Sequence, residues 1–169
     1  MSKSNLKKGF TLIELLIVIA LLGALAVGLI GAIDPFEQLK KGTDTGTRDI
    51  VNQVQTAMIR YYAIKNDMPW TSDPSQTALN VAPMIAAIVN MTATGELRSD
   101  FTDIHSAKLD DVFVTGSTVN STAIVCYLPT SKSFQADLNT KYTITGGLEA
   151  PDTCKSDPPG TQNCYWCIQ

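Results

Sequence analysis

One uninterrupted apolar run near the N-terminus limits what this chain can fold into. From Leu15 to Ile33, 19 consecutive residues carry no charged, amide or hydroxyl side chain. As a helix rising about 1.5 Å per residue, the run is roughly 28 Å long, close to the hydrocarbon thickness of a bilayer. We therefore expect residues 15–33 to cross a membrane, whereas the shorter stretch 78–91, which contains Pro83, predicts a buried helix.

Charges on either side of the run predict its orientation. Lys3, Lys7 and Lys8 precede it, and Asp34 and Glu37 follow it. Because basic residues favour the cytoplasmic side of a membrane, the rest of the chain is expected to lie outside the cytoplasm. A cleaved secretory signal also begins with basic residues, but its apolar core is shorter than this run. We therefore favour a retained membrane helix.

Beyond Pro35 the sequence changes from uniformly apolar to amphipathic. Apolar side chains recur at three- and four-residue spacing between Ile50 and Tyr62, which predicts a helix over about 44–65. Pro35 is expected to kink or loosen its connection to the membrane helix. The sequence therefore predicts a long N-terminal helix over 10–65, with one half in the membrane and the other packed on a small domain.

Residues 66–169 are predicted to form this small globular head. A helix is expected over 74–91, and the stretches after it are rich in β-branched and aromatic residues separated by turn residues. The expected strands cover 111–115, 122–128, 133–138, 141–145 and 164–168. Consecutive strands with short turns favour an antiparallel sheet, so the predicted fold class is α+β.

Four cysteines lie in the part that is expected to be exported, namely Cys126, Cys154, Cys164 and Cys167. An even number of cysteines in an oxidising compartment predicts two disulfides, and the sequence leaves their pairing open. A four-cysteine zinc site is less favoured, because only Cys164 and Cys167 form a close pair. We favour a bond from Cys126 to one of the C-terminal cysteines, since it would tie the tail to the sheet.

Residue patterns that indicate catalysis or cofactor binding are scarce. His105 is the only histidine, and its polar surroundings predict a surface residue. No phosphate-binding glycine loop or metal-binding helix motif is present, so we expect no enzyme activity and no cofactor. Asp152 and Asp157, on either side of Cys154 in a proline-rich loop, are weak calcium candidates, for which a solvated acidic loop is the favoured alternative.

Two tripeptides match the acceptor pattern for N-glycosylation. They are Asn90-Met91-Thr92 and Asn120-Ser121-Thr122. From the sequence we expect both to serve as ordinary turn or cap residues.

The most specific motif stands directly before the apolar run. Lys7, Lys8 and Gly9 are followed by Phe10-Thr11-Leu12-Ile13-Glu14. Basic residues, a glycine, an aromatic residue and a glutamate at this spacing resemble the N-terminal signal of type IV pilins and type II secretion pseudopilins. The resemblance covers roughly residues 1–62, while the head agrees only in its pilin-like architecture.

The resemblance implies a processing route and roles for several residues of the motif. A membrane aspartic peptidase, the prepilin peptidase, would cut between Gly9 and Phe10, remove the leader 1–9 and methylate the Phe10 amine. Lys7 and Lys8 would hold the cut site at the cytoplasmic surface. Glu14, an acid that costs about 2.5–3.5 kcal/mol to insert deep in a bilayer, would neutralise the Phe10 ammonium of a neighbouring subunit. The alternative is a glutamate that interacts with the positive end of its own helix dipole.

On this resemblance we expect a structural subunit of a type IV pilus-like filament. Its partners would be other copies of the chain, related pilins, the prepilin peptidase, the inner-membrane assembly machinery and, before assembly, the membrane itself. The filament would lie at the cell surface or in the periplasm. A type II secretion pseudopilin, or a minor pilin whose head serves adhesion or DNA uptake, is the alternative. The net charge of −3 argues against direct nucleic-acid binding, which normally uses a basic patch.

Overall fold

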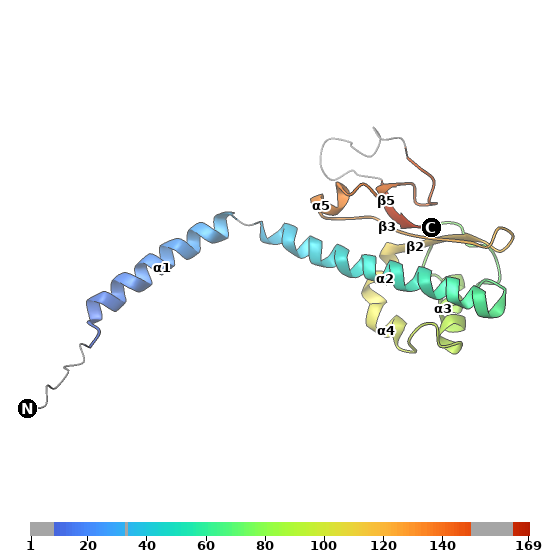
Figure 1. Cartoon of the computed structure of the whole chain (residues 1–169), viewed down its shortest axis with the longest axis horizontal. Coiled ribbons are helices and arrows are strands. Elements are labelled where there is room, and N and C mark those ends of the chain that lie inside the picture. Colours follow the sequence, from blue (N-terminus) through green and yellow to red (C-terminus); the bar gives the residue numbers. More distant parts are fainter. Residues whose placement is uncertain (1–8, 33, 150–163) are drawn as a thin grey trace, which may run out of the picture. The chain divides into compact units, whose positions relative to one another are not determined.

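A computed structural model describes residues 9–32, 34–149 and 164–169 (Figure 1). The chain divides into two compact units, an N-terminal one that ends at Phe36 and a head that runs from Glu37 to Gln169. The elements in chain order are α1 (Leu12–Ala32), α2 (Pro35–Lys65), β1 (Thr77–Ala78), α3 (Ala82–Ala93), α4 (Phe101–His105), the 3-10 helix η1 (Ser106–Asp111), β2 (Val112–Ser117), β3 (Thr122–Tyr127), α5 (Lys132–Gln135), β4 (Thr140–Tyr142) and β5 (Tyr165–Ile168).

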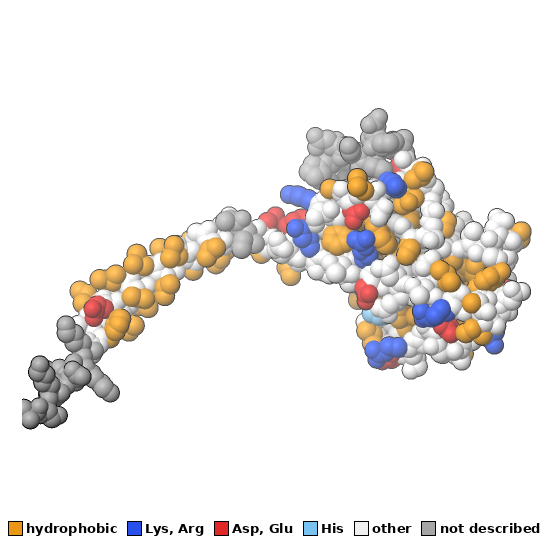
Figure 2. Space-filling model, viewed as in Figure 1, with side chains coloured by type: hydrophobic (Ala, Val, Ile, Leu, Met, Phe, Trp, Pro, Cys, Tyr) orange, Lys and Arg blue, Asp and Glu red, His pale blue; other side chains and the backbone are white. Residues whose placement is uncertain are grey.

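Helix α1 is the apolar run predicted from the sequence. Its residues Leu12–Gly31 are long and apolar enough to cross a membrane, and no other helix in the described part of the chain meets both conditions. Hydrophobic side chains cover α1 along its length, and residues 12–31 are all exposed (Figure 2). A helix that is hydrophobic all round requires an apolar environment, so α1 fits a membrane-crossing segment.

The long helix expected over 10–65 consists of two elements. Helix α1 ends at Ala32 and α2 begins at Pro35. Proline disfavours helical geometry in the residue before it, but it suits the first helical position, where its missing N–H is not needed. The side chain of Asp34 caps α2 by accepting a 3.2 Å hydrogen bond at Oδ1 from the Phe36 N–H. Pro35 therefore starts a helix at the place where a kink was predicted.

The head is built on one antiparallel sheet, as predicted for an α+β fold. Its strand order is β1-β2-β3-β5-β4, and β2 and β3 form a hairpin with Val112 opposite Tyr127 and Ser117 opposite Thr122. Helix α2 runs along this sheet (Figure 1). Its buried residues include Val51, Val54 and Met58, and they belong to one hydrophobic core with α3 and the valines of β2 and β3. The apolar face of the amphipathic helix α2 therefore packs against the core of the head.

Two predicted elements of the head are wrong. Residues 74–81 are not helical, because Thr77 and Ala78 pair with β2, and α3 starts only at Ala82. Pro83 lies in the first turn of α3, which tolerates proline, whereas the interior of a helix from Pro74 would not. The strand expected over 133–138 is instead the short helix α5 followed by a turn.

Helix α4 and the 3-10 helix η1 were not predicted from the sequence. The other expected strands are present as β2, β3, β4 and β5, with bounds that differ by a few residues. The expected loop over 151–163 lies outside the described residues.

A disulfide joins two neighbouring strands of the sheet. Cys126 in β3 and Cys167 in β5 are direct register partners, with 4.1 Å between their Cα atoms. This confirms the favoured link from Cys126 to a C-terminal cysteine. Cys164 is also disulfide-bonded, and Cys154 lies outside the described residues. The bond fixes the C-terminal strand to the central hairpin, a constraint typically worth about 2–4 kcal/mol.

A buried carboxylate fastens α2 to the start of α5. Asp44, which is 2% exposed, accepts hydrogen bonds from the N–H and hydroxyl of Thr130 (3.1 and 2.9 Å) and of Ser131 (2.7 and 2.6 Å). One turn along α2, the guanidinium of Arg48 lies 4.4 Å from the Trp166 ring centroid and 3.5 Å from an Asp137 oxygen. These contacts explain why residues 132–135 are helical, since Asp44 holds the residues that start the turn.

We predict that Asp44→Ala lowers the free energy of unfolding by about 3 kcal/mol, because it leaves the donors of Thr130 and Ser131 without their charged acceptor. Urea unfolding of the full chain in detergent, followed by tryptophan fluorescence, measures the change. Asp49→Ala is the matched control, because Asp49 is exposed on the same helix and its loss should change stability by about 0.5 kcal/mol or less. Equal effects of the two substitutions would contradict the role of Asp44.

Candidate functional site

The start of α1 is a reciprocal hydrogen-bonded cap made by Thr11 and Glu14. The Thr11 N–H and hydroxyl both donate to Glu14 Oε2, at 2.9 and 2.7 Å. In return the Glu14 N–H donates to Thr11 Oγ1 at 3.3 Å. This is the capping box that a Ser or Thr before the first helical residue forms with a Glu three positions later. Glu14 therefore has a local structural role at the helix start. The alternative stated above, an interaction with the helix dipole, did not include the hydrogen bonds to Thr11.

The cap uses one of the two carboxylate oxygens of Glu14. Both donors from Thr11 meet Oε2, and no other described residue donates to Oε1. An ionised carboxylate has about four acceptor positions on its two oxygens, so the capped group retains capacity for a further donor. Thr11 thus fixes where the charge of Glu14 lies and leaves part of the carboxylate available to a second positively charged group.

The predicted cleavage bond lies just before this cap in accessible backbone. Gly9 and Phe10 precede α1 and are exposed, with Phe10 78% exposed. A Cβ atom added to Gly9 would meet no atom within 4 Å, so packing within the chain does not require glycine there. A requirement for glycine at this position would therefore come from the enzyme that binds it. Lys7 and Lys8 lie outside the described residues.

The head shows no catalytic arrangement among its described residues. The His105 ring packs against Phe101 with 4.8 Å between ring centroids, and the Ser106 hydroxyl donates to the backbone carbonyl of Asp103. The serine therefore does not engage the histidine as a nucleophile engages its base. No group of metal-binding side chains occurs in the described ranges, and the calcium candidates Asp152 and Asp157 lie outside them.

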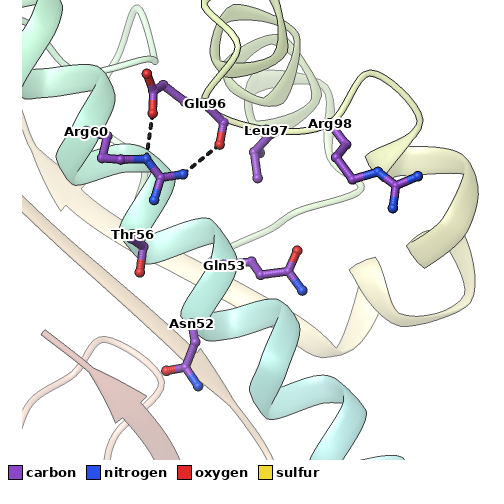
Figure 3. A pocket seen from close by; sticks show the side chains of 7 residues that line it. All are labelled: Asn52, Gln53, Thr56, Arg60, Glu96, Leu97 and Arg98. Atoms are coloured by element: carbon purple, nitrogen blue, oxygen red, sulfur yellow. Dashed lines mark hydrogen bonds and ion pairs between the residues drawn. The ribbon is translucent and has the colours of Figure 1, made fainter.

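A shallow open groove of about 300 Å³ lies between α2 and the segment that follows α3 (Figure 3). Its charged residues are already paired. Arg60 on α2 donates from Nε to Glu96 Oε2 at 2.6 Å and from Nη2 to the Glu96 carbonyl at 2.8 Å, while Arg98 pairs with Asp100 at 2.7 Å. The groove therefore presents amides, a threonine hydroxyl and paired charges. Its Arg60–Glu96 ion pair joins α2 to the segment after α3, whereas Arg98 and Asp100 both lie in that segment.

Comparison with known proteins places the characteristic segment at the N-terminus. Residues 4–30 match the family described as prokaryotic N-terminal methylation motif. Neither the curated proteins nor the solved structures contain a match to the chain. The matched residues include Gly9, Phe10 and the capping pair Thr11 and Glu14. The head, which begins at Glu37, lies outside the match.

We predict that Thr11→Val speeds amide hydrogen exchange in the first turn of α1 about 5-fold, because loss of an N-cap hydroxyl costs about 1 kcal/mol. Hydrogen–deuterium exchange of residues 12–15 in detergent micelles measures this. Thr11→Ser keeps the hydroxyl and should exchange like the unaltered chain. Unchanged exchange in Thr11→Val would show that the cap does not stabilise the helix start.

Proposed function

From the type IV pilin and pseudopilin leader signature at residues 4–30, we propose that the chain is a structural subunit of a type IV pilus-like filament. Helix α1 anchors the subunit in the membrane before assembly. The prepilin peptidase removes residues 1–9 and methylates the amine of Phe10. The subunit then polymerises through α1, with the head on the outside of the filament. The proposed work of the protein is assembly rather than catalysis.

The observation that carries this proposal is the joint presence of the signature and a capped carboxylate at the start of a fully exposed apolar helix. Cleavage after Gly9 creates an ammonium group at Phe10, one residue before the capping Thr11. In the low dielectric of a helix bundle, an ammonium and a carboxylate attract each other far more strongly than in water. Glu14 of one subunit, with its remaining acceptor capacity, suits the Phe10 amine of the next.

Helix α1 can exchange a lipid environment for the helices of other subunits without exposing apolar surface to water. Association of helices in lipid relies on van der Waals packing and polar contacts, because lipid tails are as apolar as the side chains themselves. A charge pair at the helix start adds direction and register to an association that apolar packing alone specifies poorly. It also relieves the cost of keeping Glu14 charged in an apolar medium.

Two further roles fit the same signature. A type II secretion pseudopilin would use the same leader and helix, and a minor pilin would present its head for adhesion or DNA uptake. The abundance of the chain in sheared surface filaments separates them. We expect a major pilin to dominate such filaments, a minor pilin to be scarce in them, and a pseudopilin, whose filament would lie in the periplasm, to be absent from them.

We predict that Gly9→Val blocks leader removal while leaving the fold of the chain intact, because a side chain at this position meets nothing in the chain itself but would obstruct a peptidase that approaches the backbone closely. Intact-mass measurement of the membrane fraction reports whether residues 1–9 remain. A Gly9→Val chain that begins at Phe10 would contradict the assignment of the cleavage site. Circular dichroism of the purified variant serves as the control for folding.

The assembly role of Glu14 predicts that Glu14→Ala and Glu14→Gln are both processed normally but form no filaments, or short ones, in electron micrographs. The two substitutions separate charge from capping. Glutamine retains an acceptor oxygen for Thr11 and suits a capping box, but it carries no charge to pair with the Phe10 amine. Filaments of normal length from Glu14→Gln would overturn the charge pair and leave Glu14 with its capping role alone.

A further inference from the structure

The head carries two Asn-X-Thr acceptor tripeptides, and the structure places them in opposite situations. Asn90 lies inside α3, where its amide nitrogen donates a 2.7 Å hydrogen bond to the Pro69 carbonyl. The middle residue, Met91, is fully buried, and the Thr92 hydroxyl donates to the Val89 carbonyl. A modifying enzyme would have to unfold the end of α3 to reach the Asn90 amide.

Asn120 lies in the turn between β2 and β3, at the end of the sheet beside the C-terminal end of α2 (Figure 1). The turn projects from the last strand pair, Ser117 opposite Thr122. Asn120, Ser121 and Thr122 are all exposed, and so is Val119, at 87%. Both groups that an N-glycosylating transferase needs, the Asn amide and the hydroxyl two residues later, therefore lie on an open surface turn.

Hydrogen bonds connect the turn to the rest of the head at Thr118 and Ser121, two residues whose side chains take no part in glycosylation. On one side, the Thr118 N–H donates to Asp73 Oδ1 at 2.8 Å. On the other, the Ser121 hydroxyl is 2.9 Å from the Tyr62 hydroxyl on α2, and Ser121 has a left-handed backbone with φ of 51°. These contacts hold Thr118, at the start of the turn, and Ser121, the middle residue of the tripeptide, against the head. Val119 and Asn120, which lie between them, are exposed.

We propose that Asn120 is an acceptor for an N-linked saccharide. In the transfer, Asn120 Nδ2 forms a bond to the anomeric carbon of a lipid-linked oligosaccharide. The bond from that carbon to the lipid phosphate oxygen breaks, the phosphate leaves with the electron pair, and the amide proton passes to a base of the transferase. The inference rests on the proposed export of the head, because α1 would then keep Asn120 tethered to the membrane that carries the donor.

The saccharide would occupy a position that the fold leaves open. It would extend from the apex of the turn next to Val119, and would cover this apolar side chain, which is 87% exposed. A bulky polar group on such a turn adds solubility without disturbing the core, because the flanking strands and the Ser121–Tyr62 contact are unaffected.

The test is the intact mass and glycopeptide sequence of the full chain purified from the cells that produce it. We expect the mature mass plus one saccharide increment, lost in Asn120→Gln and in Thr122→Ala but retained in Thr122→Ser. Asn90→Gln is the matched control and should retain the increment. A saccharide that persists in Asn120→Gln would show attachment elsewhere and overturn the proposal.

The same spectrum separates this inference from the proposed function. An unmodified chain that begins at Phe10 overturns the glycosylation alone and leaves the processing intact. A chain that retains residues 1–9 contradicts the processing, whatever Asn120 carries.

Discussion

An apolar helix with no protein surface to cover it is the constraint on which the rest of this molecule depends. Every residue from Leu12 to Gly31 is exposed, and each large aliphatic side chain left in water forgoes about 1.5–3 kcal/mol of burial. In the proposed function, lipid or the helices of other subunits would supply the missing contact. The hydrophobic core of the head contains no residue of α1, because its members come from α2, α3, the sheet and the segments between them.

Glu14 connects this constraint to the proposed assembly. Its Oε2 atom accepts hydrogen bonds from the N–H and the hydroxyl of Thr11, so the carboxylate has a structural role in the single subunit. The two roles are compatible because capping occupies one oxygen and pairing with an ammonium requires another. In the proposed function, the same residue caps the helix start in the precursor and would become a charge partner once cleavage had created an amine at Phe10.

The head is held together by polar and covalent links between segments far apart in the sequence. Asp44 joins α2 to the residues before α5, Arg60 and Glu96 join α2 to the end of α3, and Cys126 joins β3 to Cys167 in β5. None of these links forms a nucleophile–base pair or a metal cluster within the described ranges. A head cross-linked in this way is consistent with the proposed structural subunit.

The sequence by itself determined the features that depend on local pattern. Periodicity, turn residues and spacing act over a few neighbouring residues, and they predict the apolar run, the break at Pro35, the β2–β3 hairpin and the antiparallel sheet. The N-terminal motif was identified by its resemblance to a known signal. The tertiary structure alone decided the elements whose local preference is weak. Residues 132–135 form the short helix α5, preceded by Ser131, which is hydrogen-bonded to Asp44. Thr77 and Ala78 form a strand because they pair with the edge of β2. The tertiary structure also separated two equivalent acceptor motifs, since exposure of Asn120 and burial around Asn90 depend on how distant segments pack.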